Sequence, residues 1–524
     1  MTEGPPMPLP GRSNALDHVV VIMFENRSFD NLLGRLYQPG EVASFEGVTG
    51  KELSNPIPEW AGDGAGHQVV PYGVAPTMDA PNPDAGEEFQ HINTQLFGII
   101  DPPGNRGVLA GEMAAPYNAP AGPAPRPTMD GFVADYISAF AAEIGRQPSY
   151  DEYSQIMTGY TPEQMPVVSA LARGFAVFDH WFCEVPSQTF ANRSFFHAGT
   201  SSGFVVNTAP PDCFPLHNTA ETIFERIEAK GLSWRVYCDP PSHISLTGLI
   251  HASRLWERFG SHFVTTDQFL EDAAQGNLPS YSFIEPNFLH GHNDMHPAFN
   301  ALAPGLSFDP PSSLIGGEAL LAKIYDAVRS SSSASGSNAY NTLLMVTFDE
   351  HGGTYDHVPP PPAPPPDPAA PPGQMGFCFD RSGVRVPAIA ISAWIPDRTV
   401  VTDEYRSTSV IRTIRERWSL GAPLTGRDAA ARDLSPVFSL DTPRAPESWP
   451  EVSPRPVPVF TQPVVPHEAR LRALPRHIVF GLLALGKTLG VDTPEIDKDA
   501  DISGGEGLEI ASDLFGHLFP RLQL

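Results

Sequence analysis

Three apolar runs of this sequence end directly in side chains that could do chemistry. The side chains that follow them are Glu25 and Asn26, then Glu285 and Asn287, then Asp349 and Glu350. Ligands of an open α/β sheet bind outside the carboxyl ends of its strands, so we expect these groups to share a site. Adjacent Asp349 and Glu350 raise each other's pKa, and a divalent cation with oxygen ligands relieves that repulsion. An exposed turn is the alternative for this acidic pair.

A hydroxyl nucleophile is available in the segment Pro186–Arg193. Residues Ala191–Ala198 can form a helix, so a hydroxyl just before them lies at the positive end of its dipole, where phosphate is stabilised. Thr189 fits that place, and Ser187 is close enough to compete with it. The alternative is that either residue is only an N-cap of the helix.

Six short apolar runs predict buried strands, because most are continuous rather than alternating. They are His18–Phe24, Phe175–Phe178, Trp234–Cys238, Tyr281–Ile284, Leu343–Phe348 and Val386–Ser392. Helical patterns separate them, at Glu163–Arg173, Ala220–Lys230, Gly317–Ser330 and Ser407–Trp418, and a further one follows at Glu468–Leu489. Such alternation predicts an α/β fold, with a mostly parallel central sheet and helices on both faces.

Composition excludes several classes of partner. The chain has 524 residues and a formal net charge of −27, and no basic stripe offsets repulsion from a phosphate backbone, so no nucleic-acid partner is expected. The N-terminus shows no export signal, and no apolar stretch approaches the roughly 20 residues of a membrane span. We therefore expect a cytoplasmic protein without a transmembrane segment. The oligomeric state is left open.

Proline-rich segments suggest how the chain is divided. Ala114–Thr128 and Pro359–Gly373 interrupt the strand and helix pattern and predict exposed loops. We expect a catalytic domain over residues 15–440, in which residues 85–165 form an insertion. That insertion and the proline-rich loops would serve as lids and pocket walls. Residues 441–524 form a C-terminal appendage of unknown role.

Six segments together resemble the bacterial phosphoesterase family that includes phospholipase C and acid phosphatase A enzymes. They occur in the family's order and are Val20–Gly34, Met129–Val133, Pro186–Arg193, Phe283–Asn287, Asn293–Pro297 and Thr347–Pro360. The first reads VVIMFENRSFDNLLG and the last reads TFDEHGGTYDHVPP. The resemblance implies an alkaline-phosphatase-like fold and a metal-dependent hydrolase that acts on phosphate esters through a covalent phosphothreonine.

The resemblance also implies residue roles. The residues that match a metal and phosphate site are Glu25, Asn26, Thr189, Asp349 and Glu350, and Thr189 matches the nucleophile. The histidines that match positions near the phosphate are His91, His296 and His357, with Asn26 beside them as a substrate-binding group. One or more divalent ions would be the cofactor. The substrate would be a phospholipid or a small phosphomonoester.

Two other functions remain open. One is a phosphate-ester-binding protein without catalysis, although the set of acids, histidines and hydroxyl is complete. The other is a sulfatase-like hydrolase of the same superfamily. Sulfatases need a modified Cys or Ser in a C/S-x-P/A-x-R pattern, and the sequence around Thr189 lacks it.

Overall fold

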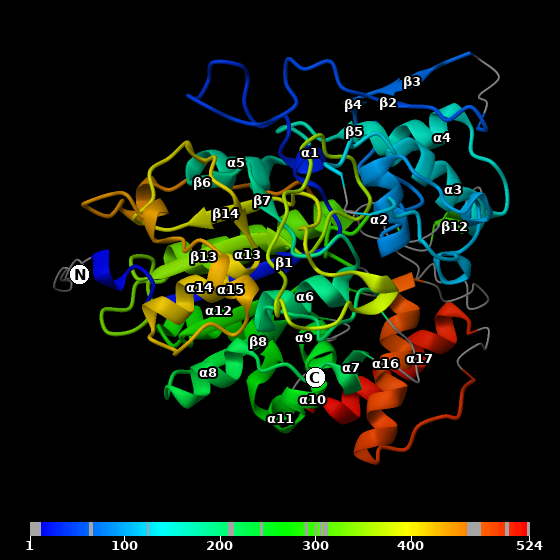
Figure 1. Ribbon diagram of the computed structural model, residues 1–524. Helices are drawn as coiled ribbons and strands as arrows, with labels where there is room; N and C mark the ends of the chain where they lie inside the picture. Colours follow the sequence, from blue (N-terminus) through cyan, green and yellow to red (C-terminus); the bar gives the residue numbers. More distant parts are fainter. Residues whose placement is uncertain are drawn as a thin grey trace.

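A central sheet of eight strands organises the protein, seen here in a computed structural model (Figure 1). The structure describes residues 12–61, 66–122, 125–207, 214–240, 245–288, 292–298, 301–303, 306–307, 313–457, 473–497 and 502–520. In sheet order the strands are β15 (Thr399–Val401), β6 (Ala176–Phe178), β14 (Ala388–Ile391), β13 (Thr342–Phe348), β1 (His18–Phe24), β10 (Tyr281–Glu285), β8 (Trp234–Cys238) and β9 (Phe263–Thr265). Strand β14 is antiparallel to both of its neighbours, and the other pairs are parallel.

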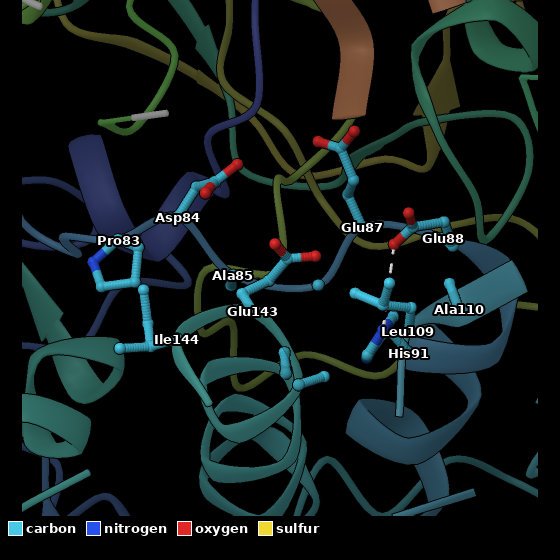
Figure 2. Close-up of a pocket in the computed structure, with 13 residues that line it drawn as sticks. Pro83, Asp84, Ala85, Glu87, Glu88, His91, Leu109, Ala110, Glu143 and Ile144 are labelled. Atoms are coloured by element: carbon cyan, nitrogen blue, oxygen red, sulfur yellow. Dashed lines mark ion pairs between the residues drawn. The ribbon is translucent and has the colours of Figure 1, made fainter. Parts of the chain in front are cut away.

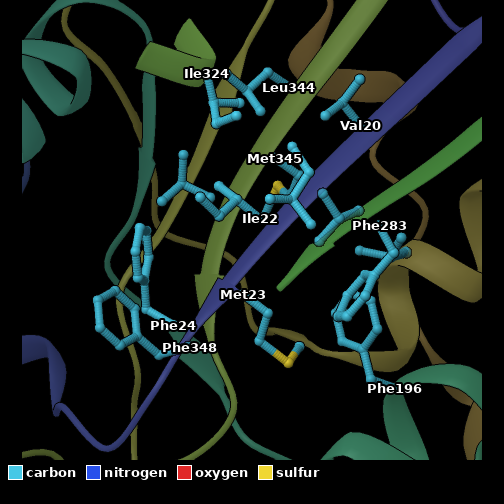
Figure 3. Close-up of a cluster of buried hydrophobic side chains, with 14 of the residues drawn as sticks. Val20, Ile22, Met23, Phe24, Phe196, Phe283, Ile324, Leu344, Met345 and Phe348 are labelled. Atoms are coloured by element: carbon cyan, nitrogen blue, oxygen red, sulfur yellow. The ribbon is translucent and has the colours of Figure 1, made fainter. Parts of the chain in front are cut away.

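Two helix layers cover the sheet. Helices in mutual contact form one layer: α5 (Pro166–Gly174), α13 (Ser313–Ser330) and α12 (Thr266–Gln275). The other layer is built around α6 (Thr189–Ala198), which contacts α8 (Ile223–Ala229), α9 (Leu246–Ile250) and α14 (Thr408–Arg417). Figure 3 shows Ile324 of α13 and Phe196 of α6 on opposite sides of β1. The central strands are continuous apolar runs because both of their faces are buried.

Several further elements are short or peripheral. They are the helices α1 (Phe29–Leu32), α7 (Phe214–His217), α10 (Ala252–Leu255), α11 (Phe259–His262) and α15 (Gly426–Ala430), and the strand pairs β2–β3 (Ser54–Pro56, Val69–Pro71), β4–β5 (Gly73–Val74, Thr158–Gly159), β7–β16 (Trp181–Phe182, Tyr405–Arg406) and β11–β12 (Ala301–Ala303, Leu306–Ser307).

The predicted α/β class is confirmed. Each of the six predicted strands is present, and the predicted helices appear with boundaries shifted by a few residues. The edge strands β9 and β15 were not predicted, because three residues are too few to show a pattern. The predicted helix Glu468–Leu489 appears as α16 (Ala473–Leu489), and its first residues lie outside the described part of the chain.

The region 85–165 supplies most of a second hydrophobic cluster, which also includes Val70, Tyr355 and Val384. The region contains α2 (Phe89–Phe97), α3 (Phe132–Ile144) and α4 (Tyr150–Ser154), and side chains such as Ile92 and Phe132 are buried between them. The loop Pro359–Gly373 runs along the body: its Pro366 carbonyl accepts a hydrogen bond of 2.7 Å from the backbone N–H of Gly426. That these segments act as lids stays a prediction.

The C-terminal region contributes two helices. Helices α16 and α17 (Gly504–Leu518) pack together, and α16 also contacts α7 and α9 (Figure 1). Leu482 and Leu485 of α16 are buried, so its apolar stripe packs against other parts of the protein. None of the helices that the structure describes is long and apolar enough to cross a membrane.

Candidate active site

Three buried carboxylates meet at the carboxyl edge of the central strands. Phe24 of β1 pairs with Phe348 of β13, so Glu25 and Asp349, the residues that follow, emerge side by side. Strand β10 pairs with the other edge of β1 and ends at Glu285. All three carboxylates are fully buried. The register of the sheet therefore brings these three strand ends together.

The turns after β1 and β13 lie against each other. The backbone N–H of Asn26 donates to Asp349 Oδ1 at 3.2 Å, and that of Arg27 donates to the Glu350 carbonyl at 3.1 Å. Asn26 has a φ of 57°, a left-handed conformation that asparagine tolerates better than most residues. A Cβ on Gly352 would lie 2.3 Å from the Asn26 carbonyl oxygen. Glycine is therefore needed for the close approach of the two turns.

The Thr189 hydroxyl lies in this cluster, and the Ser187 hydroxyl points elsewhere. Thr189 is the first residue of α6, and its Oγ1 donates to Glu25 Oε2 at 3.3 Å. Ser187 Oγ donates instead to the backbone carbonyl of Val205. Of the two hydroxyls considered, only that of Thr189 is in contact with the carboxylates.

Arg193 provides the positive charge inside the acidic cluster. Its Nη2 lies 2.5 Å from Glu25 Oε1, its Nε lies 3.2 Å from Asp349 Oδ2, and its Nη1 lies 3.6 Å from Glu285 Oε1. Glu285 is held in turn by the Thr247 backbone N–H at 2.8 Å and by further hydroxyl donors. The attraction of these carboxylates outweighs burial and raises the pKa of Arg193, so the guanidinium stays charged.

The surroundings of the acidic side chains in the site disfavour their ionised forms. Burial, followed by the charge of Asp349, raises the pKa of Glu25 well above its ordinary value. Burial also raises the pKa of Asp349, although Arg193 opposes this. The pKa of Glu350 is raised well above its ordinary value by burial and by the charges of Glu87 and Asp349. Such carboxylates favour a bound cation, because it compensates their charge.

Two orphaned oxygens fit the metal that the family resemblance implies. Asn26 uses its amide N–H groups on Glu87 and on His296 Nε2, the latter at 2.8 Å, so its Oδ1 is left as an acceptor. Asn26 Oδ1 and Glu350 Oε1 are buried without a hydrogen-bond partner among the described residues. Amide and carboxylate oxygens are ligands of hard divalent cations. The donor set therefore suits a divalent ion.

His296 reaches the site through Asn26. Its Nδ1 lies 2.7 Å from the Pro297 carbonyl, so Nδ1 carries the proton and Nε2 can accept from the Asn26 amide. Asp294, itself bonded to His292 at 2.8 Å, accepts from the His296 backbone N–H at 3.0 Å. The structure therefore brings His296 into contact with Asn26, and its predicted place near the phosphate stays a prediction.

His91 lines a cavity next to this site. The cavity of about 60 Å³ is bordered by carboxylates and by apolar side chains (Figure 2): Asp84, Glu87, Glu88, Glu143, Leu109 and Ile144. Glu87 connects the cavity to the site, because it also bonds to Asn26 and lies 3.7 Å from His296. His91 Nδ1 pairs with Asp135 Oδ1 at 2.8 Å.

We expect His91 to make stability depend on pH. Burial lowers the pKa of His91, but Asp135 outweighs this and raises it to about 9, above the ordinary 6.5. The protonated His91 therefore stabilises the folded protein fully below pH 6.5, and this stabilisation is lost as the pH rises to about 9. The difference in unfolding free energy between wild type and His91→Gln should shrink by up to about 3 kcal/mol over that range. Urea titrations at pH 6 to 9.5 measure it; a difference independent of pH would contradict the assignment.

His357 is held by a different set of partners. Its Nδ1 lies 2.6 Å from Asp30 Oδ2, and its Nε2 lies 2.8 Å from Glu46 Oε1. Asp30, Asp356 and His357 are the three side chains, among the described residues, whose potential ligand atoms lie within 4.8 Å of one another. The structure does not bring His357 into contact with Thr189 or Glu25, so its predicted place near the phosphate stays a prediction.

Sequence reasoning assigned no role to two residues of this site. Arg193 stands four positions after Thr189, a spacing that places both on one helix face once the helix is assumed. Glu87 precedes a helix in a GEE segment and carries no motif signal. Its contact with Asn26 depends on how the region 85–165 folds onto the sheet.

Comparison with known proteins shows the family of this chain. The chain is 33% identical over 462 residues to non-specific phospholipase C6 of Arabidopsis thaliana. The aligned region covers 83% of this chain and 75% of the relative. It is 27% identical over 470 residues to phospholipase C A of Mycobacterium tuberculosis, covering 83% and 79%. A solved protein of the alkaline phosphatase superfamily from Vibrio parahaemolyticus aligns with 51% of this chain and 63% of its own, at 13% identity and a TM-score of 0.31. Residues 16–421 match the Phosphoesterase family. The chain therefore belongs to that family, as predicted, and is a phosphoric ester hydrolase.

Proposed function

We propose that this protein is a metal-dependent phospholipase C-type phosphodiesterase that acts through Thr189. The observation that carries the proposal is the buried hydroxyl at the start of α6, bonded to Glu25 within the carboxylate cluster. The relatives' names supply the lipid substrate class. Glu25, Asn26, Thr189, Asp349 and Glu350 would hold the ion. When bound, a divalent cation lowers the pKa of a coordinated hydroxyl and offsets phosphoryl charge.

The residues of the chain account for the two half-reactions. Thr189 Oγ1 attacks phosphorus, its proton passes to the Glu25 carboxylate, and the P–O bond to the diacylglycerol oxygen breaks. A histidine donates a proton to that leaving alkoxide, and His296, near Asn26, is the candidate favoured by position. It acts as the acid in its doubly protonated form, in which Nε2 carries the proton to be donated and no longer accepts from Asn26. Water then cleaves the Thr189–phosphate bond and releases the phosphorylated head group. The positive end of α6 favours the anionic group throughout.

Parallel assays on two substrates test this function. Purified protein loaded with Mn²⁺ or Zn²⁺ is given phosphatidylcholine vesicles and, separately, p-nitrophenyl phosphate. We expect diacylglycerol release that is lost after chelation and restored by the metal. Turnover of p-nitrophenyl phosphate alone would favour the acid phosphatase alternative. Hydrolysis of neither ester would reject the proposal.

A further inference from the structure

A second polar cluster lies at the far end of the ENRSFD segment. Asp30 and Arg385 are fully buried, and the His357 side chain is 11% exposed. Asp30 Oδ1 pairs with Arg385 Nη2 at 2.9 Å, and Asp356 Oδ1 pairs with Arg385 Nε at 2.9 Å. Arg385 also donates to the Asp179 backbone carbonyl at 2.6 Å. We call Asp30, Asp356, His357 and Arg385 the clamp cluster.

A ladder of hydrogen bonds connects the clamp cluster to the active site. Beyond the Asn26–Asp349 and Arg27–Glu350 bonds, the Ser28 backbone N–H donates to Thr354 Oγ1 at 2.9 Å. At its far end the Asp30 backbone N–H donates to Asp356 Oδ2 at 3.1 Å. The His357 backbone N–H donates back to Asp30 Oδ2 at 2.8 Å. The two motif segments are thus joined almost residue by residue, with the carboxylate site at one end and the clamp cluster at the other.

The carboxylates of the clamp cluster have cationic partners without a metal ion. Arg385 pairs with Asp30 and with Asp356, and Lys51 pairs with the adjoining Glu46. His357 bonds to Asp30 through Nδ1, and its Nε2 lies 2.8 Å from Glu46 Oε1 and 2.7 Å from Lys51 Nζ. The carboxylate oxygens of Asp30 that a cation would need are already occupied by Arg385 and His357. Unlike the Asn26 and Glu350 oxygens, they have partners, so the cluster is suited to fixing structure.

We propose that His357 is a positioning residue, which acts through Asp30 and the clamp cluster to hold the ENRSFD turn against the DEHGG turn. It thereby sets the placement of Asn26 and Asp349 without touching substrate. This inference rests on the proposed function only in assuming that those residues hold the ion. It replaces the expected contact of His357 with phosphate.

Metal binding and unfolding test the proposal without relying on turnover. We expect His357→Ala and Asp30→Asn each to weaken Mn²⁺ binding about tenfold or more by titration calorimetry, the size typical of partners behind metal ligands. The double variant should be no weaker than the worse single one, because both act through one contact. His357→Asn, whose amide Nδ2 takes the place of Nδ1 and keeps a donor toward Asp30, should recover most of the affinity. His517 is exposed on α17, so His517→Gln serves as the matched control and should leave the Mn²⁺ affinity unchanged.

A catalytic or phosphate-binding His357 would give a different pattern. His357→Asn would then be as inactive toward ester as His357→Ala, with Mn²⁺ affinity and the urea midpoint of both variants at wild-type values. Inhibition by inorganic phosphate would weaken in both variants. That result, or additive effects of Asp30→Asn and His357→Ala on Mn²⁺ affinity, would overturn the positioning role. Absence of ester hydrolysis by the wild type rejects the proposed function and leaves this test intact. If His357→Ala does not fold, His357→Asn and Asp30→Asn decide.

Discussion

Thr189→Ala should lower kcat for ester hydrolysis by about a thousandfold or more, the size typical of losing a covalent nucleophile. The reason is the position of Oγ1 at the start of α6, 3.3 Å from Glu25. The variant should fold, because it deletes one hydroxyl and one methyl group from a helix start. Steady-state kinetics with the circular dichroism spectrum and urea midpoint measure both claims.

Ser187→Ala is the matched control for that variant. Its hydroxyl donates to the Val205 carbonyl and should affect stability rather than turnover. We expect kcat within about tenfold of the wild type, and Thr189→Ser should keep part of the activity. Mass spectrometry of protein quenched during turnover should find the phosphoryl group on the peptide that contains Thr189. A phosphoryl group on Ser187, or full activity of Thr189→Ala, would remove Thr189 from the mechanism.

Asp349→Asn should have opposite effects on metal binding and on the stability of the metal-free protein. Replacing a carboxylate ligand should weaken Mn²⁺ binding more than a hundredfold, since outer partners alone account for about 10- to 100-fold. The raised pKa of Asp349 means that its ionised form opposes folding, so the neutral amide should keep or increase the unfolding free energy of the metal-free chain. Calorimetry and urea titration in chelator measure the two quantities.

Asp403→Asn controls for the loss of one negative charge. Asp403 has a side chain that is 63% exposed and pairs with Arg432 at 3.5 Å, so neither metal binding nor stability should change appreciably. If Asp349→Asn retained wild-type Mn²⁺ affinity, Asp349 would not be a ligand. If instead it merely unfolded the protein, the predicted relief of buried charge would be wrong.

The sequence was sufficient to identify six of the eight strands of the central sheet and the polar side chains at their ends. Continuous apolar runs such as His18–Phe24 can only be buried on both faces, and parallel neighbours bring their carboxyl ends to one edge. That is why Glu25 and Asp349 could be expected in one site before their pairing through Phe24 and Phe348 was known. The order of the motifs further indicated the family.

Tertiary structure decided which polar groups actually pair, because hydrogen bonds and ion pairs depend on distances that residue spacing does not give. Arg193 lies between Glu25 and Asp349, and Glu87 reaches Asn26 from a region some 60 residues away in the chain. His357, only seven residues after Glu350, is carried along the ladder to Asp30. Sequence patterns indicate local periodicity and burial. The partner of a buried charge depends instead on which opposite charge lies near it in the folded chain.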